Sequence, residues 1–136
     1  MPSHRKIFKQ GNSRAITLPI HQLRDIGYEH GSYGVIGCID DRSLILEIHR
    51  PDIDIASLKA RANAFGAGFW RKIYRSGKSV ILALPPHLLE KVGVTTGDYF
   101  VTAPMSPHSL LLTAESNAQA RFRMHSIPKG TGTPPP

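Results

Sequence analysis

The residues best suited to chemistry are basic, and they stand beside glycine turns at two places in the chain. The two sets are Arg5, Lys6, Lys9, Gly11, Asn12, Ser13 and Arg14, and then Arg71, Lys72, Arg75, Gly77, Lys78 and Ser79. Lysine and arginine neutralise phosphates, while Asn, Ser and turn amides donate hydrogen bonds to phosphates or base edges. This pattern predicts about six to eight contacts to a phosphate backbone, and hence a steep salt dependence of binding.

The two basic sets belong to an internal repeat. Residues from Arg5 onward reappear 66 positions later, and this offset holds without a gap for about 44 residues. Leu18-Pro19 returns as Leu84-Pro85, and Gly27 returns as Gly93. The chain therefore holds two copies of one unit. A second interpretation of the cations stays open, because lysines on exposed edge strands also prevent pairing with other chains. A duplicated edge strand would carry the same lysines twice.

The elements that must position these residues follow from the apolar pattern and from the turn residues. In the first copy, Pro19 opens a short helix with apolar Leu23 and Ile26, and Gly27 ends it. The strands predicted in that copy are residues 5–9, 14–18, 33–39 and 43–48. The second copy repeats the helix after Pro85 and the last two strands at 99–103 and 110–114. We expect Pro104 and Pro107 to bracket the turn between those last strands.

The predicted organisation has four segments. They are repeat 1 at 1–50, a connecting helix at 51–68, repeat 2 at 69–116 and a basic, Pro/Gly-rich tail at 117–136. Asp54 is expected to cap the connecting helix, and Gly66 and Gly68 to end it. The apolar stripe of that helix is Ile55, Leu58, Ala62 and Phe65. Residues 126–136 are predicted to be disordered.

Composition sets the broad class of protein. The chain has 136 residues, a net charge of +7 and a single cysteine, Cys38. One cysteine forms neither an intrachain disulfide nor a cysteine zinc cage, and it suits a reducing compartment. No apolar run approaches the roughly 18–20 residues of a membrane helix, and no secretory signal is found. We expect a cytoplasmic, nucleoid-associated protein with no cofactor, no metal, no membrane contact and a polyanionic partner.

The ordered set of motifs resembles the SpoVT-AbrB (AbrB/MazE) family of DNA-binding domains. In the first copy the resemblance rests on the run from Lys9 to Pro19, followed by Ile26-Gly27 and Gly31. In the second copy it rests on the run from Gly77 to Pro85, followed by Val92-Gly93-Val94 and Gly97-Asp98. The resemblance implies a mainly β fold, a swapped-hairpin barrel built from two tandem ββαββ repeats. We expect the repeats to pair within the chain, and a homodimer stays open.

The resemblance also implies a partner and a site. The partner is double-stranded DNA, bound by a transcriptional regulator that is not an enzyme. The expected contacts are Arg5, Lys9, Asn12, Ser13, Arg14, Arg24, Arg71, Arg75, Lys78 and Ser79, beside Lys6 and Lys72 of the same basic strands. Arg24 corresponds to Glu90 and Arg14 to Val80 in the second copy. The second copy is therefore expected to contact DNA less, or to serve mainly to complete the barrel.

Two other functions stay open. One is an antitoxin that neutralises a toxin and represses its own operon, although the basic tail argues against a basic toxin as partner. The other is a protein-assembly module that uses the barrel as a platform. The equivalent His21 and His87 are more simply exposed helix residues than metal ligands, and Asp40 and Asp41 suit a hairpin turn. Trp70 is expected to pack the connecting helix rather than to stack on a base.

Overall fold

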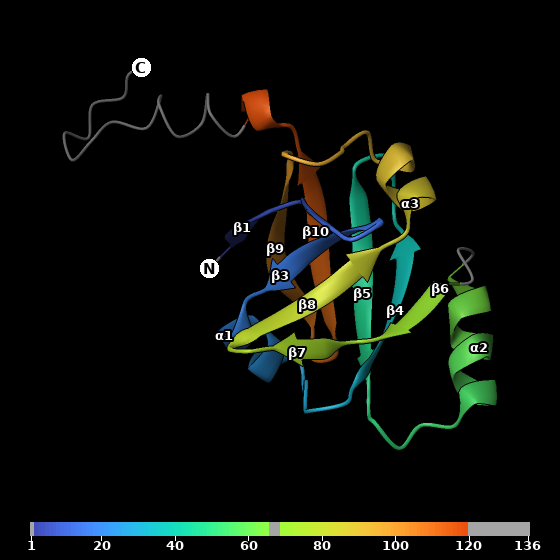
Figure 1. The fold of residues 1–136 in the computed structure, drawn as a ribbon. Helices are drawn as coiled ribbons and strands as arrows, with labels where there is room; N and C mark the ends of the chain where they lie inside the picture. The colour runs from blue at the N-terminus through green and yellow to red at the C-terminus, as the bar shows by residue number, and fades with distance from the viewer. Residues whose placement is uncertain (1, 66–68, 120–136) are drawn as a thin grey trace.

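The protein is mainly β, with every strand paired antiparallel (Figure 1). The computed structural model describes residues 2–65 and 69–119. Its strands are β1 (Ser3–Lys6), β2 (Phe8–Gln10), β3 (Ser13–Leu18), β4 (Tyr33–Cys38), β5 (Ser43–His49), β6 (Phe69–Lys72), β7 (Tyr74–Ser76), β8 (Ser79–Leu84), β9 (Tyr99–Ser106) and β10 (Ser109–Glu115). Its helices are α1 (Ile20–Asp25), α2 (Ile55–Ala64) and α3 (Pro86–Lys91).

Strands from the two halves of the chain pair with each other in both sheets. The larger sheet has the order β1-β9-β10-β5-β4-β6, so strand β1 of the first half lies on β9 of the second, and β6 of the second half lies on β4 of the first. The smaller sheet has the order β2-β3-β8-β7. Its central pair joins the halves from Arg14 opposite Leu84 to Leu18 opposite Val80. Neither half could fold this way without the other.

The sheets are open, where a closed barrel was expected. Residues 5–9 and their repeat were each predicted as one strand, but Ile7 and Ile73 interrupt them. Both isoleucines are buried, at 1% and 0% exposure, and the chain crosses from the large sheet to the small one at these corners. Strands that switch sheets in this way make the corners of two packed sheets. At one corner, Ile7 and the 97–98 turn exchange backbone hydrogen bonds of 2.8 and 2.9 Å.

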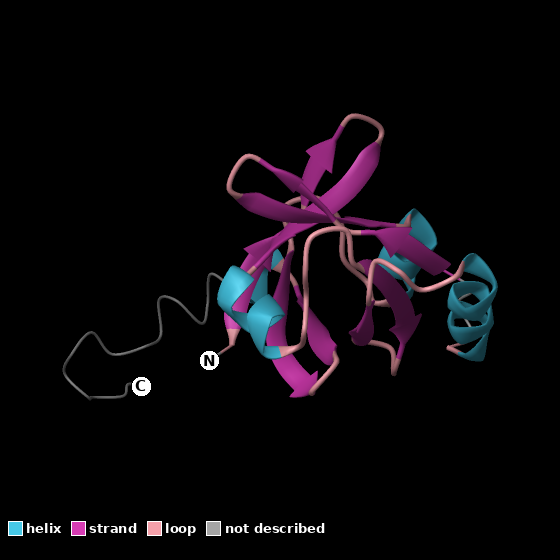
Figure 2. Cartoon of the chain, turned by 90° about the horizontal axis from the view of Figure 1, so that it is seen from below, coloured by secondary structure: helices cyan, strands magenta, loops and turns pink. Residues whose placement is uncertain are grey.

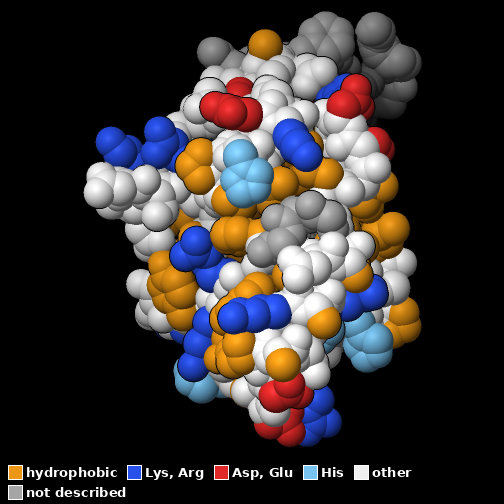
Figure 3. All heavy atoms as spheres, turned by 90° about the vertical axis from the view of Figure 1, so that its right-hand side faces the viewer, with side chains coloured by type: hydrophobic (Ala, Val, Ile, Leu, Met, Phe, Trp, Pro, Cys, Tyr) orange, Lys and Arg blue, Asp and Glu red, His pale blue; other side chains and the backbone are white. Residues whose placement is uncertain are grey.

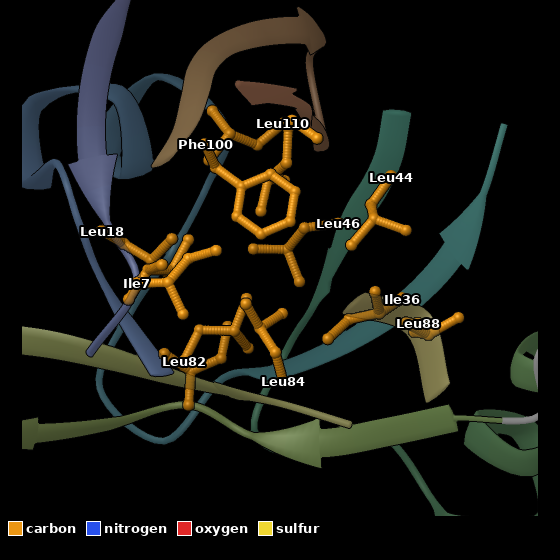
Figure 4. Packing of buried hydrophobic residues seen from close by; sticks show 14 of the residues in the cluster. Ile7, Leu18, Ile36, Leu44, Leu46, Leu82, Leu84, Leu88, Phe100 and Leu110 are labelled. Carbon is orange, nitrogen blue, oxygen red and sulfur yellow. The ribbon is translucent and has the colours of Figure 1, made fainter. Parts of the chain in front are cut away.

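The core lies between the two sheets (Figure 4). Leu82 from the small sheet and Leu46 and Phe100 from the large sheet point into it, and all three are 0% exposed. Leu88 of α3 closes one side of the same cluster. In β5 the buried Leu44, Leu46 and Ile48 alternate with half-buried residues, as the two-residue period of a strand predicts. The core is therefore shared by the two repeats.

Helix α2 packs on the face of the large sheet that points away from this core. Asp54 caps it as expected, accepting a 3.0 Å hydrogen bond from the backbone N–H of Ser57. Leu58 and Ala62 pack against Val35, but Ile55 is 44% exposed, so its place in the predicted buried stripe was wrong. The expected end at Gly66 and Gly68 lies outside the described residues. In 2–65 and 69–119 no helix is long and apolar enough to cross a bilayer.

The β9–β10 hairpin also differs from the prediction. Pro104 stands inside β9, opposite Leu110, rather than in the turn. It is tolerated there because β1 ends at the Ser3–Thr102 pair, so the outer edge of β9 needs no further ladder bonds. A register shift beside Leu110 marks a bulge in the same hairpin. Of the predicted tail, residues 120–136 lie outside the described part of the chain.

Candidate nucleic-acid interface

Two hairpin turns carry the glycines that the repeat singled out. Gly11 lies between β2 and β3 with φ of 59°, and Gly77 lies between β7 and β8 with φ of 63°. This left-handed conformation is easy for glycine and strained for other L-residues. Both hairpins project from the side of the small sheet that faces away from the large sheet (Figure 2). The exposed Asn12 and Lys78 follow the two glycines, so each turn presents a polar side chain outward.

The strands behind these turns carry unbalanced positive charge. Lys9 of β2 lies directly opposite Arg14 of β3, and Lys9 is exposed while Arg14 is half-buried. Like charges directly opposite each other on a sheet destabilise it. Arg75 of β7 is exposed and lies opposite Val80. Two cations side by side on an exposed hairpin favour an anionic partner, because a bound anion removes their repulsion.

Each end of the small sheet combines a turn of one half with the helix of the other. β3 ends at Leu18, opposite Val80, so α1 begins near the Lys78 turn, and Figure 1 shows both at one end of the sheet. Helix α1, which carries Arg24, therefore lies at the Lys78 end of the sheet, and α3, which carries Glu90, lies at the Asn12 end. Strand β3 has six residues, so the two ends are at least about 20 Å apart. The interleaved pairing thus places the helix that carries Arg24 at the end of the copy that has Glu90 in the equivalent position.

Arg5 has partners within the protein. Its Nη1 donates to Thr17 Oγ1 at 3.2 Å, and its Nε donates to Ser3 Oγ at 3.1 Å. Burial lowers the pKa of the Arg5 guanidinium from its usual value. The bond to Thr17 joins β1 to β3 across the two sheets, and the bond to Ser3 is within β1. Arg5 is thus built into the fold more firmly than the hairpin cations.

The remaining predicted cations lie on the edge strands of the large sheet. Lys6 is on β1 and Lys72 on β6, at opposite edges, and both are exposed. Arg71, also on β6, lies with its guanidinium 5.0 Å from the ring centre of Phe69. These three residues flank the hairpins but are not part of them. In contrast Lys9, Asn12, Ser13, Arg14, Arg75, Lys78 and Ser79 are all on the small sheet or its turns.

Sequence reasoning missed two residues of this surface. Tyr74 of β7 is 42% exposed, and its hydroxyl donates a 2.7 Å hydrogen bond to Gln10 Oε1 of β2. These residues come from the two outer strands of the small sheet, so the bond links the hairpins of the two halves. The signal in the sequence was the recurrence of an aromatic residue, Phe8 and then Tyr74, beside the basic positions.

The surface on the α2 side is less uniform. Figure 3 shows acidic side chains gathered at its two ends, whereas lysine and arginine are spread over the whole face. On this side Arg61 of α2 bonds Glu47 of β5 through two contacts, 2.6 and 2.7 Å long. Arg61 is the main cause that lowers the pKa of the Glu47 carboxyl, and His49 adds to it. Here Arg61 is therefore neutralised by an acid of the same chain.

Other candidates from the sequence have ordinary surroundings. His21 and His87 are exposed, and Asp40 accepts a 2.9 Å hydrogen bond from the backbone N–H of Arg42 inside its turn. Trp70 packs with the cluster beneath α2. The described ranges contain no group of three or more His, Cys, Asp or Glu residues able to hold a metal ion.

Comparisons with known proteins add no assignment. A scan against protein-family models, a search of curated proteins and a search of solved structures each found no match for this chain.

Proposed function

We propose that the protein is an AbrB-type regulator that binds duplex DNA through the two basic hairpins. The observation that carries this proposal is that one such hairpin from each half projects from the same side of the molecule (Figure 2). The proposal includes the interleaved-hairpin architecture of the SpoVT-AbrB family, completed within one chain. It is supported by the ladders between β1 and β9, between β4 and β6, and between β3 and β8.

In the proposed complex, phosphate contacts set the position and side chains in the groove read the sequence. Four cations lie on the hairpins, namely Lys9, Arg14, Arg75 and Lys78, and Arg24 is on α1 at the Lys78 end of the small sheet. A two-stranded ribbon fits the major groove, which is about 12 Å wide. The groups proposed to read bases are Asn12, Arg14 and Arg24, because amide and guanidinium groups make paired hydrogen bonds with adenine and guanine.

The test is a fluorescence anisotropy titration of the full chain against a labelled duplex between 50 and 200 mM salt. Three phosphate contacts, from Lys9, Arg75 and Lys78, give a slope of log K against log salt of about −2.7, or a roughly 40-fold loss of affinity over that range. Absence of binding at 50 mM salt, or affinity that does not change with salt, would overturn the proposal.

A second measurement separates a regulator from the alternatives. Selection of bound sequences from a random duplex pool should enrich one motif if bases are read. An antitoxin would in addition co-purify with a small toxin. An assembly module would keep its protein partner after nuclease treatment and enrich no motif, which would contradict the regulator proposal.

A further inference from the structure

The outer face of the large sheet carries two equivalent platforms, related by the 66-residue offset. The first platform consists of Tyr33, Val35 and Trp70, and the second of Tyr99, Val101 and His4. Val35 lies opposite Trp70 in the ladder between β4 and β6, just as Val101 lies opposite His4 in the ladder between β9 and β1. The matching rings meet edge-on in both, with centroids 5.9 Å apart for Tyr33 and Trp70 and 6.4 Å apart for His4 and Tyr99.

Only the first platform is covered in the described part of the chain. There α2 places Leu58 and Ala62 on Val35, which is 0% exposed. Val101 of the second platform is only half-buried, and no helix among residues 2–65 and 69–119 is packed on its platform as α2 is on the first. In Figure 1, α2 lies beside β6 and β4, while β1 and β9 are at the other edge of the sheet. The repeat therefore leaves the second platform without the counterpart of α2.

We propose that residues 121–127 of the same chain dock on the second platform. Helix α2 begins six residues after β5 ends at His49, and the same count after Glu115 of β10 gives Arg121. The segment supplies the apolar side chains that such a surface can bury, namely Phe122, Met124 and Ile127. The occupant is thus the part of the chain that follows the second repeat as α2 follows the first.

The path of the chain and its charges agree with this occupant. The backbone N–H of Asn117 donates a 2.7 Å hydrogen bond to Oδ1 of Asp98, the residue next to Tyr99 of the platform. Gln119 is two residues further along the chain than Asn117, and two residues span at most about 7 Å. A segment that starts after Gln119 is therefore within reach of the platform. Asp98 places an acidic group at the platform edge. The arginines that flank Phe122 complement this acid.

Limited trypsin digestion of the full chain tests the docking. When the segment is docked, trypsin cannot cut the peptide bonds after Arg121 and Arg123. The cleavage rate is therefore proportional to the population of the undocked form. Val101→Asp puts a carboxylate under the apolar side chains and should speed this cleavage about tenfold or more. The control Ile39→Asp adds the same charge at a residue that is 46% exposed on the other half, and should cleave as the wild type does. Equal cleavage in the wild type and Val101→Asp would overturn the proposal.

A second variant distinguishes release of the segment from unfolding of the platform, because Val101→Asp could also destabilise the sheet. Phe122→Ser changes no residue of the described strands and helices, and it should shift the methyl signals of Val101 in a carbon–proton spectrum. Thr131→Ser, further along the chain, should leave those signals in place. Val101 methyl signals that are the same in Phe122→Ser and in the wild type would contradict the docking. Signals that instead change with protein concentration would show a second copy on the platform, which would also overturn it.

Discussion

Lys78 is the residue whose removal should report most cleanly on DNA binding. It lies in the exposed turn between β7 and β8, and in the proposed complex it meets one phosphate. Lys78→Ala should therefore reduce the slope of log K against log salt by about 0.9. If the contact acts only by counterion release, wild type and variant bind equally at 1 M salt. The affinity of the variant is then about 15-fold lower at 50 mM salt and about fourfold lower at 200 mM.

The matched control is Lys59→Ala. Lys59 is exposed on α2, away from the hairpin turn (Figure 1), and its loss lowers the net charge by the same one unit. It should leave the slope unchanged. Both variants should keep their unfolding free energy within about 0.5 kcal/mol, because both side chains are on the surface.

Anisotropy titrations of both variants at four salt concentrations give the two slopes directly. Equal losses of affinity in Lys78→Ala and Lys59→Ala would mean that DNA responds to overall charge. The hairpin assignment would then be refuted, even if the wild type binds DNA.

The other predictions concern the elements that hold this surface in place, each checked by urea denaturation. Gly77→Ala forces a side chain into the left-handed region and should cost about 1 kcal/mol. Leu58→Ala removes a side chain of α2 that is 0% exposed, and it should lower the unfolding free energy by about 2–5 kcal/mol. Arg5→Ala removes two side-chain hydrogen bonds and should lower the unfolding free energy, whereas an unchanged midpoint would contradict its role in the fold. Arg61 lowers the pKa of Glu47, so this pair stabilises the protein above the unfolded pKa of about 4.3 and is lost as pH falls through the lower folded value. Glu47→Gln should therefore flatten the decline of stability between pH 5 and 3.

The repeat made much of the fold predictable from the sequence. The offset located the duplicated strands, and turn chemistry placed Gly11 and Gly77 correctly. Asp54 was recognisable as a cap because it directly precedes a helical apolar pattern. Local signals of this kind depend on neighbouring residues, so a single sequence contains them.

Other features depend on contacts far apart in the chain. The interruptions at Ile7 and Ile73 arise because each side chain turns into a core shared by both sheets, and no local pattern records that. The 2.7 Å bond between Tyr74 and Gln10 joins residues 64 positions apart. Similarly, the helix that carries Arg24 lies at the Lys78 end of the small sheet only because β3 pairs with β8.

The most direct test of the central claim is amide chemical-shift mapping of the full chain as duplex DNA is added at low salt. We predict that the largest shifts fall on the turns around Gly11 and Gly77 and on Arg24, while α2 stays unchanged. Shifts centred on α2, or no shifts at saturating DNA, would contradict the claim that the two hairpins form the DNA-binding surface.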